Sequence, residues 1–176
     1  MSGGAHLTAN LPSARRLGPA RVRGVCIGAV LLLAATVLTA CADEPVTLES
    51  PVLDEADTAT CDAFLDALPR RLDGEEKRKV NPAAALGRAW GDPPIIVRCG
   101  ADVPSSFDQT PACQVVGGVG WFATEDRSGD QVFTAVDHFP IVSVQVPGDE
   151  SDRTDDVLAD LAAPIEGHLE PIDACD

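Results

Sequence analysis

The segment that precedes Cys41 limits which part of this chain can fold. Residues 1–40 contain no Asp or Glu, and their four arginines all lie ahead of an apolar run that begins at Val25. The run reaches Leu38 and is about 14 residues long, which is shorter than the roughly 20 residues of a typical transmembrane helix. Basic residues followed by a short apolar run are typical of a signal peptide. We therefore expect residues 1–40 to be removed on export.

The end of the apolar run predicts how the mature protein begins. Residues 38–41 read Leu-Thr-Ala-Cys and resemble a lipobox, in which a branched apolar residue and two small residues precede a cysteine. The small residues let a peptidase approach the backbone, and the sulfur of Cys41 carries a diacylglyceryl group. The sequence therefore predicts a lipid anchor at Cys41 on the outer face of the cytoplasmic membrane. The alternatives are an uncleaved helix that remains in the membrane and a plain secreted form without a lipid.

The net charge of the mature chain argues against several classes of function. The 176 residues include 28 acidic and 13 basic ones, and four of the basic residues leave with residues 1–40. The mature formal charge is therefore −19. Nucleic acids attract proteins through Lys and Arg, so this balance excludes nucleic acid as a partner. It also argues against a domain that lies flat on an anionic leaflet.

Four cysteines remain in the mature chain besides the one at its start: Cys61, Cys99, Cys113 and Cys175. An even number of cysteines in an oxidising compartment predicts two disulfides. The spacing contains no Cys-x-x-Cys unit, so it indicates neither a zinc ribbon nor a thiol redox site. Four cysteines allow three pairings, and their positions alone do not choose among them.

The mature chain divides into two regions. Residues 41–58 are acidic and contain Pro45 and Pro51, so we expect a flexible, lipidated tether there. Residues 59–176 have the size of one extracytoplasmic domain. Their hydrophobic periodicity predicts helices at 61–68, 83–90 and 155–169, and strands at 95–97, 114–116, 119–124, 131–136 and 141–146. This order predicts a two-layer α+β fold, in which a roughly five-stranded, mostly antiparallel sheet packs against N- and C-terminal helices and is stapled by disulfides.

Several short motifs of the expected domain resemble those of a known family. They are Cys61-Asp-Ala-Phe-Leu-Asp-Ala-Leu-Pro69, Ala89-Trp-Gly-Asp-Pro-Pro94, Val97-Arg-Cys-Gly100, Gly118-Val-Gly-Trp121, Phe133-Thr134 and Val144-Gln-Val-Pro147. Together they resemble an uncharacterised family of actinobacterial envelope lipoproteins that is known only as a domain of unknown function. The family pattern keeps the helix cysteine and the Arg-Cys-Gly cysteine together, which implies a Cys61–Cys99 disulfide and leaves Cys113 to pair with Cys175. The resemblance implies a location in the envelope, but no activity or ligand.

The mature chain shows no pattern of catalytic or metal-binding residues. Its two histidines, His138 and His168, have no second metal ligand at a usable spacing, and no serine lies in a Gly-x-Ser-x-Gly turn. The acidic stretches 125–130 and 149–156 lack the register of an EF-hand loop, so solvated turns are the better interpretation. We expect no enzyme activity, no cofactor and no metal. A buried polar cluster around His138 would indicate an enzyme instead.

One local cluster departs from the acidic balance of the chain. It consists of five of the nine basic residues of the mature chain: Arg70, Arg71, Lys77, Arg78 and Lys79. Such a cluster can bind an anionic polymer, a phospholipid head group or an acidic partner. It can equally form a solvated segment that nearby acidic residues neutralise, namely Asp73, Glu75 and Glu76. We favour this second interpretation.

These features favour a non-enzymatic, lipid-anchored accessory domain that binds an unknown envelope protein or a wall component. The basic cluster is its candidate partner-binding patch. A lipoprotein that binds a small ligand or a cation is the alternative, and it would have a concave pocket near Trp90 or Trp121. Both tryptophans are otherwise expected to pack in the core. An enzyme is the third hypothesis.

Replacement of Cys41 tests the predicted anchor. Cys41→Ser removes the sulfur that would carry the lipid, so the protein should leave the membrane fraction and its N-terminal processing should change. Membrane fractionation and mass spectrometry of the N-terminal peptide measure the two effects. Continued membrane retention of the variant, with residues 1–40 still attached, would show that an uncleaved helix holds the protein.

Overall fold

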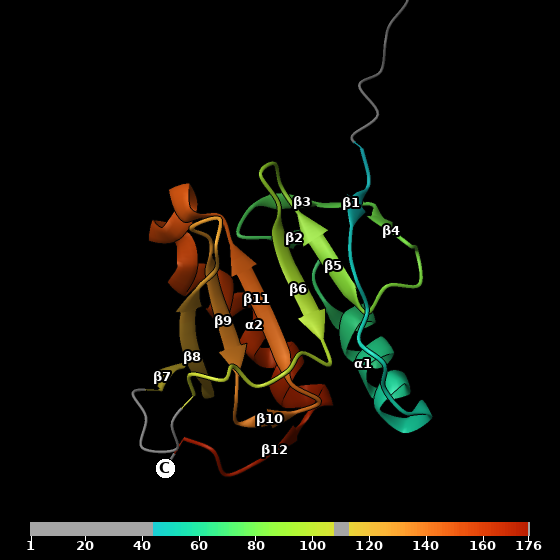
Figure 1. Ribbon diagram of the computed structural model, residues 1–176, viewed down its shortest axis with the longest axis vertical. Helices are drawn as coiled ribbons and strands as arrows, with labels where there is room; N and C mark the ends of the chain where they lie inside the picture. The colour runs from blue at the N-terminus through green and yellow to red at the C-terminus, as the bar shows by residue number, and fades with distance from the viewer. Residues whose placement is uncertain (1–43, 108–112, 176) are drawn as a thin grey trace, which may run out of the picture. The chain divides into compact units, whose positions relative to one another are not determined.

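The computed structural model describes residues 44–107 and 113–175 (Figure 1). The predicted signal peptide, the lipobox and Cys41 lie outside these residues. Helices α1 and α2 span Glu55–Ala67 and Thr154–His168, and a short 3-10 helix, η1, spans Gly148–Arg153. Together with a large antiparallel sheet, they confirm the predicted α+β class. The described residues contain no helix that is long and apolar enough to cross a membrane.

Eight strands form the main sheet, in the order β2-β3-β5-β6-β11-β9-β8-β7, and all neighbouring strands are antiparallel. Their bounds are Arg71–Leu72 (β2), Glu75–Arg78 (β3), Gly87–Trp90 (β5), Ile95–Cys99 (β6), Gln114–Val116 (β7), Val119–Glu125 (β8), Gln131–Ala135 (β9) and Val142–Val146 (β11). Two smaller pairs join β1 (Val46–Thr47) to β4 (Val80–Asn81) and β10 (His138–Phe139) to β12 (Glu170–Pro171). The main sheet is therefore larger than the five strands expected.

The five strands predicted from hydrophobic patterns are present as β6, β7, β8, β9 and β11. In β11, Val144 belongs to the hydrophobic core, whereas the side chain of Gln145 bonds to polar groups on the other side of the sheet. Gly117 and Gly118 form the turn between β7 and β8 with positive φ angles of 63° and 94°. Such angles are what a two-residue hairpin turn requires.

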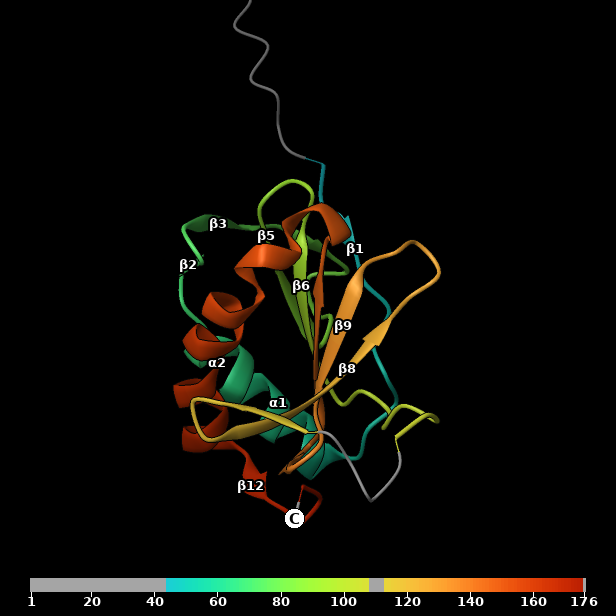
Figure 2. The same ribbon diagram turned by 90° about the vertical axis from the view of Figure 1, so that its left-hand side faces the viewer.

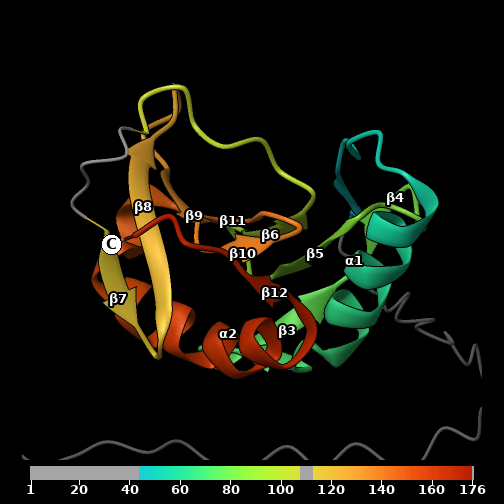
Figure 3. The same ribbon diagram turned by 90° about the horizontal axis from the view of Figure 1, so that it is seen from below.

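Both helices pack on one face of the main sheet (Figure 2). The core contains Phe64 of α1, Leu158 of α2 and Trp121 of β8, none of which is more than 1% exposed. On the opposite face, the loop after β6 crosses the sheet (Figure 3). Phe107 of that loop contacts Phe122 of β8 edge to face, with ring centres 5.2 Å apart.

The prediction of a helix over residues 83–90 is wrong, because residues 87–90 form strand β5. This strand lies between β3 and β6, and its pairing on both sides outweighs the helical preference of an Ala-rich segment. Gly87 permits a close approach to β6, since a Cβ at this position would come within 2.9 Å of the Val97 carbonyl oxygen. The Asn81-Pro82 peptide bond is cis, and Pro82 lies between β4 and β5.

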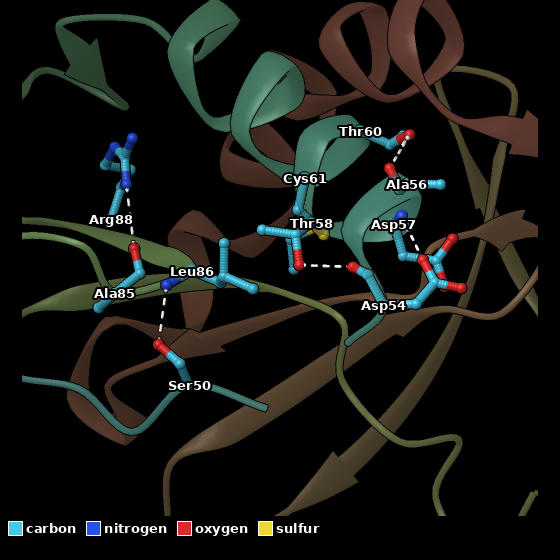
Figure 4. Close-up of a disulfide and its surroundings, with 11 residues drawn as sticks. Ser50, Asp54, Ala56, Asp57, Thr58, Thr60, Cys61, Ala85, Leu86 and Arg88 are labelled. Carbon is cyan, nitrogen blue, oxygen red and sulfur yellow. Dashed lines mark hydrogen bonds between the residues drawn. A yellow bond between two sulfur atoms is a disulfide. The ribbon is translucent and has the colours of Figure 1, made fainter. Parts of the chain in front are cut away.

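The flexible tether predicted over residues 41–58 is also wrong for the part that the structure describes. Val46 N donates to the Lys79 carbonyl oxygen at 2.9 Å, and this bond begins the parallel β1–β4 pair. Leu48 is only 3% exposed and belongs to a second, smaller apolar cluster that includes Ala89 of β5. Two residues later, Ser50 Oγ accepts a hydrogen bond from Leu86 N at 3.0 Å (Figure 4). The N-terminal segment is therefore part of the folded domain.

Helix α1 begins earlier than the predicted Cys61. Asp54 caps it, since its Oδ1 accepts a hydrogen bond from Asp57 N at 2.9 Å (Figure 4). Acidic residues in the first turn, such as Glu55, favour this end of a helix. Thr60 lies inside the helix and donates its hydroxyl to the Ala56 carbonyl oxygen. Residues whose acidity suggested a tether are thus the start of the helix.

Two disulfides have the pairing that the family resemblance implies. Cys61 of α1 bonds to Cys99 of β6, and Cys113 bonds to Cys175 beyond β12. The sequence separations are 38 and 62 residues. In the chain-entropy model, each bond destabilises the unfolded chain by roughly 4 kcal/mol. The first disulfide joins α1 to the centre of the sheet, and the second holds the C-terminal segment beside β7.

Truncation of Leu48 tests whether the N-terminal segment is packed. Leu48→Ala should lower the free energy of unfolding by about 2 to 4 kcal/mol, because it leaves a cavity above β5 and β6. Val52 is 99% exposed, so Val52→Ala in the same segment should change stability by less than about 0.5 kcal/mol. Denaturant unfolding of the two variants measures the difference. Equal and negligible effects would mean that residues 44–53 are a free tether in solution.

Candidate functional site

A cavity of about 460 Å³ lies beside the β2–β3 hairpin. We call it the hairpin pocket. It is lined by the hairpin turn, strand β3 and the residues that follow β5: Gly74, Glu75, Glu76, Lys77, Arg78, Lys79, Gly91 and Asp92. Its volume is within the range of sites for small ligands. Three of the five residues of the predicted basic patch, Lys77, Arg78 and Lys79, line this pocket, whereas Arg70 and Arg71 do not.

Each carboxylate of the hairpin pocket is paired with an arginine. Glu76 pairs with Arg71 across the β2–β3 hairpin. Asp92 Oδ1 lies 3.4 Å from Arg78 Nη1. The third carboxylate, Glu75, lies 3.4 Å from Arg153 Nη2. The acidic residues of the lining therefore do not neutralise its lysines.

Arg153 joins the hairpin to the start of α2. It pairs with the Asp73 carboxylate, and its Nη2 donates to the Asp73 carbonyl oxygen at 2.6 Å. The hydrogen bond to the Asp73 side chain is the main cause that raises the pKa of Arg153. On η1, Glu150 Oε2 lies 3.2 Å from Arg153 Nη1. Arg153 therefore organises the acidic stretch 149–156, and it neutralises Asp73, which we expected to balance the basic cluster itself.

Lys77 lies over the indole ring of Trp90, with Nζ 5.6 Å from the ring centre. Trp90 is fully buried and donates from Nε1 to the Pro69 carbonyl oxygen at 3.2 Å. This cation–π contact helps to fix the ammonium group at the pocket. Partial burial is the main cause that lowers the pKa of Lys77, and the charge of Arg88 lowers it further, whereas Asp66 opposes the shift.

Lys77 and Lys79 are the only two lysines of the whole chain, and both line the hairpin pocket. Neither forms an ion pair with a carboxylate in the part of the chain that the structure describes. The lining therefore carries three carboxylates and three cations, and its two lysines are the cations that no described carboxylate pairs with. A lysine ammonium can donate to a phosphate or carboxylate oxygen.

Arg78 has a structural role at the same place. Its Nη2 donates to the Glu44 carbonyl oxygen at 2.9 Å, and its Nη1 donates to the Gly91 carbonyl oxygen at 3.1 Å. The side chain is only 14% exposed. Arg78 therefore joins the N-terminal segment to the end of β5.

In the turn at residues 125–130, predicted to be solvated, carboxylates accept hydrogen bonds from the turn itself and from Gln145. Asp126 Oδ1 accepts hydrogen bonds from Ser128 N at 2.8 Å and Asp130 N at 3.1 Å, and Oδ2 accepts one from Gln145 Nε2 at 3.2 Å. The bond from the Ser128 hydroxyl is the main cause that lowers the pKa of Asp126. Within residues 44–107 and 113–175, no group of three or more His, Cys, Asp or Glu side chains could hold a metal ion.

His138 is buried beside Asp137, and its Nδ1 lies 2.7 Å from Asp137 Oδ1. The other carboxylate oxygen accepts a hydrogen bond from Gly120 N at 2.6 Å, and the Asp137 carbonyl oxygen accepts one from Ile172 N at 2.7 Å. The pair therefore joins β10 to β8 and to the C-terminal segment. His168 lies exposed at the end of α2.

Comparison with known proteins identifies a family for this chain. A family model described as "Protein of unknown function (DUF3515)" matches residues 22–173. This match confirms the expectation of an uncharacterised domain family. No curated protein and no solved structure matches the chain.

The pKa of Lys77 provides a test of the electrostatics in the pocket. Its ammonium should titrate below the usual value of 10.5. Arg88→Gln removes a repelling cation and should raise this pKa, whereas Asp66→Asn removes an attracting carboxylate and should lower it. NMR titration of the lysine side chain in the three proteins measures the shifts. Identical midpoints in all three would show that Arg88 and Asp66 do not act on Lys77.

Proposed function

The chain belongs to the DUF3515 family of unknown function, and we propose that it is a non-enzymatic, lipid-anchored protein of the cell envelope that binds an anionic partner in the hairpin pocket. The observation that carries this proposal is the pair of lysines without carboxylate partners, Lys77 and Lys79, in a cavity of about 460 Å³. In a domain with a formal charge of −19, selection of an anion is not a general property of the surface. It has to come from this local arrangement.

The pocket chemistry fits an anionic group with several oxygens. Lys77 and Lys79 are both exposed, and Lys77 is held over Trp90 at the same lining. Two ammonium groups supply up to six N–H donors and no acceptor, which suits a phosphate or a carboxylate better than a cation or a neutral sugar. A charged hydrogen bond in a partly enclosed site is stronger than one on an open surface.

The proposed location rests on the sequence and is consistent with the disulfides. Residues 38–41 resemble a lipobox, and the described chain begins three residues after Cys41. Two disulfides suit a protein that folds outside the reducing cytoplasm. We propose that the protein is held on the outer face of the cytoplasmic membrane of an actinobacterium, with an envelope protein, a wall component or a lipid as the source of the anionic group.

A lipoprotein that binds a free small anion is the second candidate. The volume of the hairpin pocket favours it, because about 460 Å³ can enclose most of a small metabolite. The pocket lies beside Trp90, as the small-ligand hypothesis expects. A free ligand and a macromolecular partner differ in one respect that can be measured, since only the latter gives a large covalent adduct after crosslinking.

Crosslinking in cells tests the proposed function. A photoreactive residue in place of Asp92, which lines the pocket, should give adducts of increased mass in the membrane fraction. The same residue in place of Val52, which is 99% exposed and lies outside the pocket lining, should give few. Lys77→Gln together with Lys79→Gln should reduce the Asp92 adducts at least several-fold, because the variant lacks the cations that bind the partner.

Matched variants make this experiment specific to the pocket. Arg127→Gln removes one exposed cation from the β8–β9 turn and should leave the adducts unchanged. Adducts that survive the double lysine variant would contradict binding in the pocket. An absence of large adducts, combined with a melting temperature that rises with added phosphate or carboxylate compounds, would favour the small-ligand candidate instead.

A further inference from the structure

The hairpin pocket lies where the N-terminal segment joins the domain. Glu44 is held by Arg78, whose Nη2 donates to its carbonyl oxygen at 2.9 Å. Two residues later, Val46 N donates to the Lys79 carbonyl oxygen at 2.9 Å. Figure 1 shows β1 beside the end of the domain that carries β3 and β4. The side chain of Arg78 and the backbone of Lys79 are therefore in contact with the first described residues, and Lys77 precedes both on the same stretch of chain.

This position limits how far the pocket can lie from Cys41. Three residue steps separate Cys41 from Glu44, and a fully extended chain spans at most about 3.6 Å per residue. The two Cα atoms are therefore no more than about 11 Å apart, whatever the conformation of the residues between them. A lipid on Cys41 would keep the β1–β4 end of the domain at the membrane surface. The longer tether expected from the sequence would not do so.

The total charge of the domain does not oppose contact at this end. The negative surface potential of an anionic leaflet decays over a Debye length, about 8 Å at physiological ionic strength. Only charges near the anchor experience it. The hairpin pocket brings two lysines without a carboxylate partner among the described residues there, together with three carboxylates that each pair with an arginine. Asp43 and Glu44 follow the anchor in the sequence, so docking depends on direct hydrogen bonds from the two lysines to phosphate oxygens and not on the net charge of this end.

We propose that the hairpin pocket docks on the phosphate groups of anionic phospholipids in the leaflet that holds Cys41. This inference rests on the proposed function, because it requires a lipidated Cys41 and an anionic group in the pocket. It names the chemistry of that group as the phosphodiester of a head group. Lys77 and Lys79 donate to the phosphate oxygens, and Arg78 fixes the domain so that its pocket end lies at the membrane surface.

The two lysines also provide the measurement, because no other lysine exists in the chain. The lipidated protein is reconstituted into vesicles of phosphatidylcholine alone, or of equal parts of phosphatidylcholine and phosphatidylglycerol. A neutral amine-acylating reagent is added, and mass spectrometry measures the rate at each lysine. We expect acylation of Lys77 and Lys79 to be several-fold slower on the vesicles that contain phosphatidylglycerol. High salt should remove the difference, because it shortens the Debye length.

Single-site variants show whether the protection comes from the pocket. Lys79→Gln should weaken the protection of Lys77, whereas Arg127→Gln removes the same charge from a hairpin four to five strands away and should preserve it. Four to five strand spacings correspond to about 19 to 24 Å, or more than two Debye lengths. Glu44→Gln removes a repelling carboxylate near the anchor and should strengthen the protection.

The outcomes separate this inference from the proposed function. Equal acylation rates on the two kinds of vesicle would overturn docking on lipid. Protection in native membranes, without protection on phosphatidylglycerol vesicles, would also overturn it and would assign the pocket to a protein or wall partner. An N-terminal peptide without a diacylglyceryl group on Cys41 would instead contradict the proposed lipid anchor.

Discussion

The pairing of β5 with β6 is the interaction on which the rest of the structure depends. It places Trp90 in the core opposite Ile95 and extends the sheet toward β3. On the other face, Ala89 and Ile96 form the surface on which Leu48 packs. Without β5, the β2–β3 hairpin would have no neighbour in the sheet, and the N-terminal segment would have no apolar surface to cover. The core, the pocket and the packing of the N-terminal segment thus all depend on the pairing of β5 with β6.

Hydrophobic patterns predicted the strands whose apolar and polar residues alternate along the sequence. Strands β6, β7, β8, β9 and β11 were predicted because each has β-branched residues bounded by turn residues. Strand β5 reads Gly-Arg-Ala-Trp after an Ala-rich stretch, and its strand state comes from neighbours on both sides that a local pattern does not contain. The N-terminal segment was misinterpreted for a similar reason. Its acidity and prolines conceal Leu48, whose burial depends on residues some 40 positions later.

The basic residues of the candidate site could be predicted from the sequence, but the ion pairs around them could not. The basic cluster was evident, and one of its expected partners, Glu76, does neutralise Arg71. Asp73 and Glu75 instead pair with Arg153, which lies 80 and 78 residues away in the sequence. The sequence therefore overestimated how far nearby acidic residues neutralise the basic cluster. That the two lysines have no carboxylate partner among the described residues became evident only from the ion pairs. Long-range pairing of this kind leaves no signal in a single sequence.

Because the N-terminal segment is packed, the negative charge of the domain has a different effect at an anionic membrane. A long tether would let repulsion between the domain and an anionic leaflet hold the two apart. With Glu44 fixed by Arg78, the domain in the proposed arrangement cannot move away, so repulsion acts on its orientation instead. The end that carries the lysines is attracted, and the acidic remainder is repelled over the Debye length. In the proposed arrangement the two lysines of the pocket lie at the anchored end and most of the formal charge of −19 lies farther from the leaflet, so the field of the leaflet favours a single orientation of the domain.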